Sequence, residues 1–135
     1  MAISLNAIID KHEWVLDLGA TYHMSHNSLD TFDQIMCPTQ MAKIHLSNGQ
    51  ATSIAHIGNV KLVNKLKLKD VLHVPYFKFN LLYVSKVVKG NQCYVIFHPK
   101  FCLIQDCANK KLLGIGKEQQ GLYYLVNPLL RCILI

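Results

Sequence analysis

The stretch from Trp14 to Met24 constrains the fold of this chain more than any other. Its apolar run ends on a single carboxylate, Asp17, and Gly19 follows two positions later. Glycine admits backbone angles that a side chain would forbid, so the chain can turn sharply behind the carboxylate. We therefore expect a buried central strand that carries Asp17 on a tight loop, a place where functional side chains are commonly held.

Alternation of apolar and polar residues predicts many short strands separated by turns. Asn48-Gly49 suits the left-handed angles of a two-residue type I′ turn, which predicts a β-hairpin around it. Gly58 should mark a bend or bulge before a second hairpin, whose turn is at 64–65. The predicted strands are 14–16, 43–47, 50–54, 60–63, 66–69, 71–74, 93–97, 101–105, 111–115 and 122–126.

Only one stretch changes to a helical period. It predicts a short helix at about residues 80–89, with Asn80 as its N-cap and Gly90 just past its C-terminal end. The irregular stretch 22–39 should be a long ordered loop with one helical turn starting at Ser28. Short strands with one short helix predict an all-β fold, a small closed β-barrel.

Length and composition indicate one folded domain. Apolar residues make up 51% of the 135 and charged residues only 16%, which allows a core and argues against disorder. We expect residues 1–12 to be a lead-in segment and 13–126 to be the barrel. Residues 127–135 should be an apolar tail, truncated or disordered.

Cysteine usage and hydropathy bear on location. The five cysteines include no Cys-x-x-Cys pair, and an odd count without a signal peptide predicts reduced thiols. No stretch approaches the roughly 20 apolar residues that a membrane span needs. We therefore expect an intracellular, soluble protein with no membrane partner.

The charge balance is basic. Lys plus Arg number 14 and Asp plus Glu number 8, a net charge of +6 that permits attraction to nucleic acid or acidic partners. The lysines are nevertheless spread along the chain, most densely at Lys61, Lys65, Lys67 and Lys69, where alternation with leucines predicts the solvated face of strands. Since no basic-aromatic motif occurs, direct binding of nucleic acid is not expected.

Two histidines close to the Asp17 stretch raise the question of a metal. His23 and His26, with Cys37 or His12, could imitate a zinc site, but no Cys-x-x-Cys knuckle or His-Glu motif accompanies them. We expect no metal and no cofactor. Packing beside the Asp17 loop is the expected role of His23.

Together, the order and spacing of these pieces resemble the protease region of Copia-type (Ty1/copia-like) retrotransposon Pol polyproteins. The resemblance covers about residues 13–126, and 110–126 overlap the start of the pre-integrase region. A chain limited to this region is typical of an isolated fragment of such a polyprotein or of a degenerate copy. The matching stretches are WVLDLGATYHM at 14–24, IHLSNG at 44–49, IGNV at 57–60, LKDVLHVP at 68–75, FKFNLLYVSK at 77–86 and GLYYL at 121–125.

The resemblance implies a retropepsin-like closed barrel and, in active members, an aspartic endopeptidase that cuts its own polyprotein in the cytoplasm or the element's particle. That chemistry needs two carboxylates about 3 Å apart that share one proton. The chain has one Asp-x-Gly, so an active enzyme would be a homodimer with Asp17 from each subunit. The resemblance makes Asp17, Leu18, Gly19 and Ala20 the catalytic loop, and Ser47, Asn48, Gly49 and Gln50 the flap that closes over a peptide substrate.

Two residues depart from the family pattern: Tyr22 replaces an acidic residue that is common after the motif, and the main departure is Leu18. Leu18 stands where members carry Ser or Thr, and losing a hydrogen bond to a charged group costs roughly 1.5–3 kcal/mol. The favoured hypothesis is therefore a degenerate, catalytically impaired barrel. The alternative is an active homodimeric aspartic endopeptidase that uses Asp17, and a second alternative is a basic module associated with nucleic acid.

Overall fold

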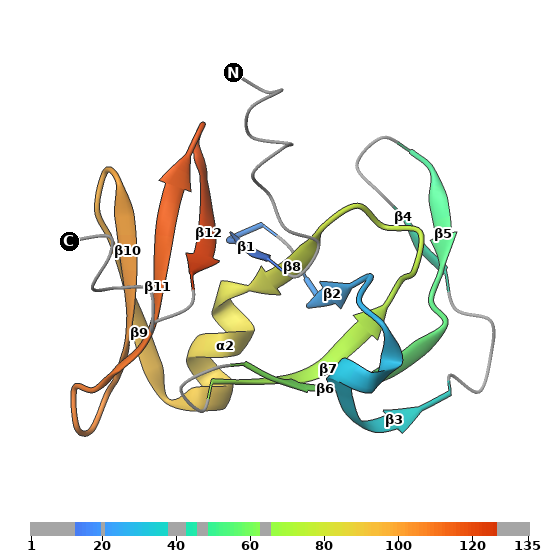
Figure 1. Cartoon of the computed structure of the whole chain (residues 1–135), viewed down its shortest axis with the longest axis horizontal. Helices are drawn as coiled ribbons and strands as arrows, with labels where there is room; N and C mark the ends of the chain where they lie inside the picture. Colours follow the sequence, from blue (N-terminus) through green and yellow to red (C-terminus); the bar gives the residue numbers. More distant parts are fainter. Residues whose placement is uncertain (1–12, 20, 38–42, 46–48, 63–65, 127–135) are drawn as a thin grey trace.

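The computed structural model describes residues 13–19, 21–37, 43–45, 49–62 and 66–126, so the predicted lead-in and tail lie outside it. Figure 1 shows a mostly β molecule with one α-helix, which confirms the predicted all-β class. In chain order the elements are β1 (Trp14–Asp17), β2 (Met24–Ser25), the 3-10 turn η1 (Leu29–Thr31), β3 (Phe32–Met36), β4 (Lys43–His45), β5 (Ala51–Ser53), β6 (His56–Lys61), β7 (Lys67–His73), β8 (Asn80–Tyr83), α2 (Val84–Asn91), β9 (Cys93–Phe97), β10 (Phe101–Asp106), β11 (Leu112–Gln119) and β12 (Leu122–Val126).

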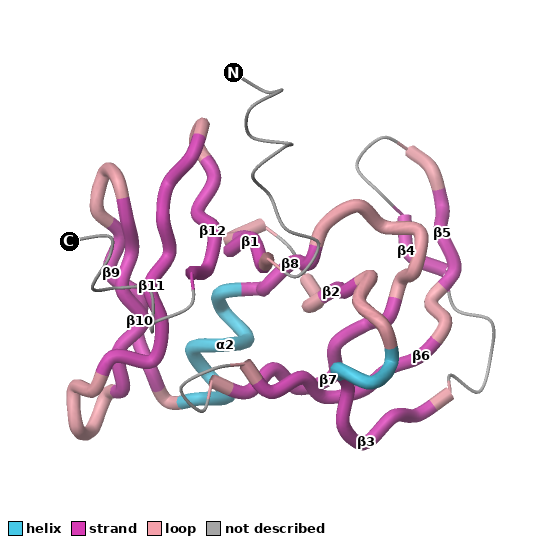
Figure 2. The backbone as a smooth tube through the Cα atoms, viewed as in Figure 1, coloured by secondary structure: helices cyan, strands magenta, loops and turns pink. Residues whose placement is uncertain are grey.

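Ten strands form one sheet in the order β3-β6-β7-β2-β8-β1-β12-β11-β10-β9, and β4 pairs with β5 separately. The central strand β1 runs parallel to β8 and antiparallel to β12. The sheet bends around α2, which lies between β9–β12 on one side and β6–β7 on the other (Figure 2). Its hydrogen-bonded ladder ends at β3 and β9, so the described strands do not close the predicted barrel by hydrogen bonds.

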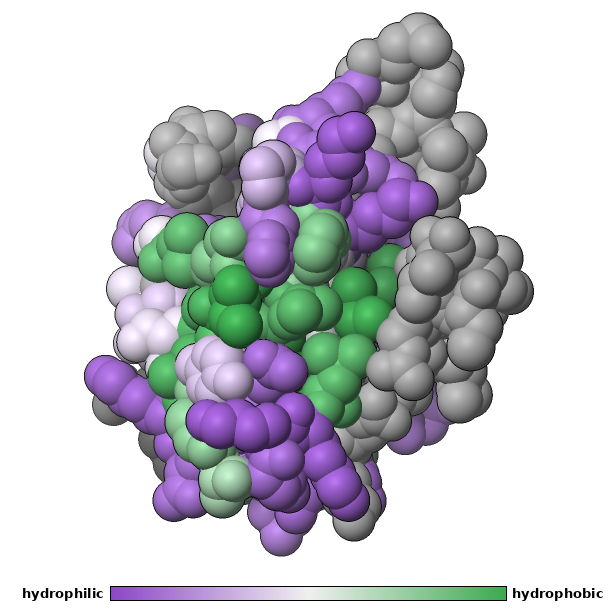
Figure 3. Space-filling model, turned by 90° about the vertical axis from the view of Figure 1, so that its left-hand side faces the viewer, coloured by the Kyte–Doolittle hydropathy of each residue, from purple (hydrophilic) through white to green (hydrophobic). Residues whose placement is uncertain are grey.

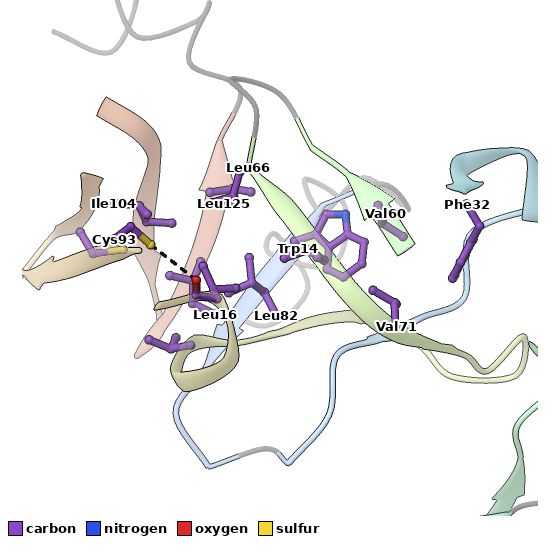
Figure 4. Close-up of a cluster of buried hydrophobic side chains, with 14 residues drawn as sticks. Trp14, Leu16, Phe32, Val60, Leu66, Val71, Leu82, Cys93, Ile104 and Leu125 are labelled. Carbon is purple, nitrogen blue, oxygen red and sulfur yellow. Dashed lines mark hydrogen bonds between the residues drawn. The ribbon is translucent and has the colours of Figure 1, made fainter. Parts of the chain in front are cut away.

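The core is centred on the alternating inward side chains of β1. Trp14 and Leu16 are buried with Leu82 of β8, and Ile104 of β10 and Leu68 of β7 are fully excluded from solvent (Figure 4). Burying one such side chain stabilises the fold by about 1.5–3 kcal/mol. The strand that carries Asp17 is therefore buried on both of its faces from Trp14 to Leu16, as this apolar run predicts.

The predicted helix begins too early. The range 80–89 combines a strand, β8, with most of α2, which starts at Val84. Asn80 is not the N-cap, because its side chain is buried and bonds to other segments of the chain. The helix also continues past Gly90 to Asn91, and its C-cap Gln92 takes the left-handed conformation at φ 48°.

The predicted loop at 22–39 contains two strands. The helical turn expected from Ser28 is confirmed as η1. β2 is only two residues long and is set by its neighbours β7 and β8, and β3 is an edge strand with four of its five residues exposed. Neither strand has an apolar alternation, because neither presents a regular face to the core.

The second hairpin, β6–β7, is confirmed, but its predicted turn is wrong by one residue. Lys61 lies opposite Lys67, whereas a two-residue turn at 64–65 would place position 61 opposite 68. Positions 63–65 lie outside the described residues. The register shifts between Gly58 and Val60, which is the predicted bulge. The strands predicted at 66–69 and 71–74 are one continuous strand. Asp70 takes φ 56° opposite the bulge and donates its N–H to the Asn59 side chain, which keeps the strand running.

The first hairpin, β4–β5, is also present, but its predicted turn is wrong by one residue. His45 lies opposite Ala51, whereas a two-residue turn at 48–49 would place position 45 opposite 52. Ser47 and Asn48 lie outside the described residues. Gly49 has φ +87°, and a hairpin loop with an odd number of residues commonly uses a glycine in that conformation.

The four C-terminal strands follow the prediction closely, except that β11 extends four residues further than expected, to Gln119. One face packs on the core through Cys102 and Ile104. Figure 3 shows apolar side chains gathered in the middle of the face on the left of Figure 1. The strand register places an apolar row across these strands: Ile96, Leu103, Ile115 and Val126.

A close contact between β10 and β11 makes Gly116 a sensitive core position. A Cβ at Gly116 would clash with Cys102 Sγ, so Gly116→Ala should destabilise the fold by about 1–3 kcal/mol through overpacking. The control is Gly90→Ala in α2, where a Cβ meets nothing within 4 Å. The higher helix propensity of alanine should raise the free energy of unfolding of this variant by about 0.5–1 kcal/mol. Urea unfolding at neutral pH measures both, and equal midpoints for the two variants would contradict the packing argument.

Candidate functional site

Asp17 is the last residue of β1, opposite Tyr83 of β8, and its side chain is half-buried. Its Oδ1 accepts a hydrogen bond from the Gly19 N–H at 2.8 Å. Gly19 does not have a positive φ, and a Cβ there would make only an ordinary 3.7 Å contact with Asp17 Oδ1. The expectation that Gly19 supplies forbidden backbone angles is therefore wrong, and the turn is instead closed by the Asp17 side chain.

The rest of the predicted loop projects outward. Leu18 is 68% exposed, an unusual position for a large apolar side chain. Ala20 lies outside the described residues. Within the described part of the loop, the carboxylate has a backbone N–H as its partner, and the neighbouring side chain is a hydrocarbon with no hydrogen-bonding group.

A hollow of about 650 Å³ lies beside the loop. Asp17 and Gly19 line it from β1, and Gln50 of the predicted flap lines it from the β4–β5 hairpin. The fold therefore brings the predicted carboxylate and one predicted flap residue to the same surface. Leu18 and Gly49 are exposed and are not among the described residues that line the hollow.

An aromatic wall that was not predicted from the sequence lines one side of this hollow. The wall consists of Tyr76, Phe77 and Phe79 from the loop after β7. The two phenylalanine rings pack edge to face, with 6.4 Å between their centroids. Tyr76 is 90% exposed. Three aromatic residues within four positions after Pro75 are the signal that could have identified this wall. The lining also contains polar side chains such as Thr21, Gln50 and Lys78, so this concave surface offers an aromatic wall for the apolar side chains of a peptide and hydrogen-bonding groups for its backbone.

His23 immediately precedes β2 and is almost completely buried. Its Nδ1 accepts a hydrogen bond from the Tyr83 N–H at 2.8 Å, which ties β2 to the end of β8. Burial, and to a smaller extent the positive charge of Lys86, together lower the pKa of His23 from 6.5 to about 4. The imidazole is therefore neutral at pH 7, with its proton on Nε2.

Neither a metal site nor a membrane helix is found in the described ranges. No three His, Cys, Asp or Glu side chains among those residues gather closely enough to hold a metal ion, and His12 lies outside them. Within the same ranges, no helix has the length and apolarity to cross a bilayer.

Asn80 joins the segments that surround the site. Its Oδ1 accepts from Ser25 Oγ at 2.8 Å and from the His26 N–H at 3.1 Å. Its Nδ2 donates to the Glu13 carbonyl at 3.1 Å and to Asn27 Oδ1 at 3.3 Å. A fully buried amide with donors and acceptors all paired holds the start of β1, the end of β2 and β8 in one arrangement.

Removing this amide should be costly. Asn80→Ala leaves Ser25 Oγ and the His26 N–H without their acceptor, and we expect a loss of about 2–4 kcal/mol in unfolding free energy. Asn109→Ala is the control, because that exposed amide also accepts a backbone N–H but water can replace it. Urea unfolding of both variants tests this, and a loss below that of the control would rule out a central role for the amide.

The buried imidazole predicts a pH dependence of stability. In the unfolded state His23 takes up a proton as the pH falls below its ordinary pKa of 6.5. In the folded state it stays neutral until the pH approaches about 4. Its contribution is therefore complete above pH 6.5 and is lost as the pH falls toward 4, by about 3 kcal/mol in total. His23→Asn keeps an acceptor for the Tyr83 N–H and should flatten the fall between pH 6.5 and 4, with a residual slope from His73, whose pKa burial also lowers.

Urea titrations at several pH values measure this slope in both proteins. An equal slope in His23→Asn would show that other groups cause the acid sensitivity.

Comparisons with known proteins agree on one family. The model of the family described as "Pol polyprotein, beta-barrel domain" matches residues 14–92. The chain is 28% identical over 126 residues to a retrovirus-related Pol polyprotein from transposon RE1 of Arabidopsis thaliana, and 29% identical over the same length to that from transposon RE2. These alignments cover 90% of this chain and 8% of each relative, so the chain spans a small part of the curated proteins it matches.

Proposed function

The chain belongs to the Pol polyprotein beta-barrel domain family, and from this membership we propose that it is the protease-like barrel of a Copia-type retrotransposon Pol polyprotein. In this proposal the Asp17 loop does not hydrolyse peptides efficiently. The domain persists as a structural or peptide-binding module of the polyprotein, located in the cytoplasm or in the particle of the element.

The observation that carries the proposal is Leu18. Two carboxylates must meet across a dimer for this hydrolysis, and the residue after each one lies at the meeting point. Leu18 is 68% exposed beside Asp17, so two apolar side chains without a donor would enter that contact. They would shield the carboxylates from water without forming the hydrogen bonds that hold the paired loops.

The energetic cost is large enough to matter. A hydrogen bond to a charged group contributes roughly 1.5–3 kcal/mol, which corresponds to a rate about 10- to 100-fold lower if the bond stabilises the transition state. The barrel itself does not depend on this side chain, because Leu18 lies outside the core. Substitution at this position can therefore remove activity and leave the fold intact.

The hollow beside Asp17 supports retained peptide binding. Asp17 and Gln50 lie on one surface with the aromatic residues Tyr76, Phe77 and Phe79. An extended apolar peptide would bury part of these rings, a favourable exchange for exposed aromatic area. The same surface favours the alternative function, an active homodimeric endopeptidase that processes its polyprotein, if the paired loops tolerate Leu18.

Cleavage of a peptide library near pH 5 tests the proposal. We expect no cleavage by the protein as it stands and an increase of at least about tenfold in kcat/KM for Leu18→Ser, because serine restores a hydroxyl beside the carboxylate. Adding Asp17→Asn to Leu18→Ser should abolish that activity. Circular dichroism at the assay pH must accompany each measurement, since protonation linked to His23 weakens the fold in this range.

Two results would contradict the proposal. Cleavage by the unaltered protein that Asp17→Asn removes would make it a working enzyme. A folded but inactive Leu18→Ser protein would mean that the impairment does not originate at Leu18.

A further inference from the structure

A second hollow, of about 690 Å³, lies between the β6–β7 hairpin and the C-terminal half of α2. It shares no described lining residue with the hollow beside Asp17. Five of the described residues that line it are lysines, and the single carboxylate among them belongs to Asp33. We call this hollow the lysine groove, and its lysines are Lys61, Lys67, Lys69, Lys86 and Lys89.

The fold concentrates charges that are dispersed in the sequence. Lys67 and Lys69 lie on the exposed face of β7, on either side of the fully buried Leu68. Lys61 of β6 lies directly opposite Lys67 in the register. Like charges that face each other across a strand pair are destabilising, so this arrangement weakens the isolated domain.

The helix adds two further charges to the same surface. Lys86 and Lys89 are three positions apart in α2 and therefore lie on one face of it. The Asn91 side chain accepts from the Lys67 N–H at 3.0 Å and donates to the Lys67 carbonyl at 2.8 Å, which fixes the helix end against β7. Lys89 offsets the negative end of the helix dipole, but the strand lysines are not needed for that.

We propose that the lysine groove binds the phosphate backbone of single-stranded nucleic acid. Ammonium groups are compact charges that pair with phosphate, and five of them around one hollow provide a path for a polyanion. A flexible single strand can follow a concave surface, whereas a duplex, with a persistence length of about 50 nm, stays straight over such a distance. No aromatic ring is among the described lining residues, so binding should be electrostatic, independent of sequence and sensitive to salt.

Fluorescence anisotropy with labelled oligo(dT) and oligo(U) of about 20 nucleotides tests the groove in the intact chain. Lys67→Gln/Lys69→Gln/Lys89→Gln should weaken binding at least about tenfold at about 50 mM salt and reduce the salt slope by about two, the value for three lost phosphate contacts. The matched control removes the same charge from exposed lysines of the β9–β12 region, as Lys100→Gln/Lys111→Gln/Lys117→Gln, and should change the affinity less than about twofold.

Each other outcome counts against the proposal. Equal weakening by both triple variants would assign the binding to net charge alone. Tighter binding of a duplex of the same length would contradict a groove for single strands. Absence of any binding at about 50 mM salt would show that the lysine groove is not a nucleic-acid site. Lys69→Glu alone provides a second test if the triple variant unfolds, because an exposed reversal of charge should weaken binding without lowering the melting temperature.

Discussion

The hydrogen bonds of the buried Asn80 side chain hold together the region on which the candidate site depends. Its amide binds the Glu13 carbonyl just before β1 and the Ser25–Asn27 segment, which begins at the last residue of β2. These segments have no regular strand pairing with each other at these points, so the amide provides the polar contacts that β-ladders provide elsewhere. The position of β1, and with it the Asp17 loop, follows from this arrangement and from the core that surrounds Trp14.

The strands whose partners are adjacent in sequence could be predicted from local patterns. The β9 and β12 ranges match the structure, because alternation and turn residues specify hairpins without distant contacts. Asn80 could not be interpreted in this way, since its partners lie 53 to 67 residues away along the chain. An asparagine before an apolar run is typical of a helix N-cap, and here a tertiary contact overrides that preference.

The candidate site shows the same division. The apolar run and Asp17 located the loop, because strand and loop are contiguous. The lysine groove could not be located, because it combines residues from elements that meet only after folding. The aromatic residues of the wall are close together in the sequence, but only the fold places them beside Asp17. Lys67 and Lys69 have the local pattern of a solvated strand face, and that interpretation is correct for the strand itself. Their role changes once α2 places Lys86 and Lys89 across the same hollow.

The stability of this fold and aspartic catalysis are favoured at different pH values. A pair of facing carboxylates that shares one proton is favoured at acidic pH. The neutral imidazole of His23 contributes most above pH 6.5 and progressively less toward its folded-state pKa of about 4. The imidazole supports the same β2–β8 junction that positions the loop, through its bond to the Tyr83 N–H. The contribution of His23 to stability is thus largest where a carboxylate pair would be least able to keep a shared proton, which supports the proposed binding role near neutral pH over acid hydrolysis.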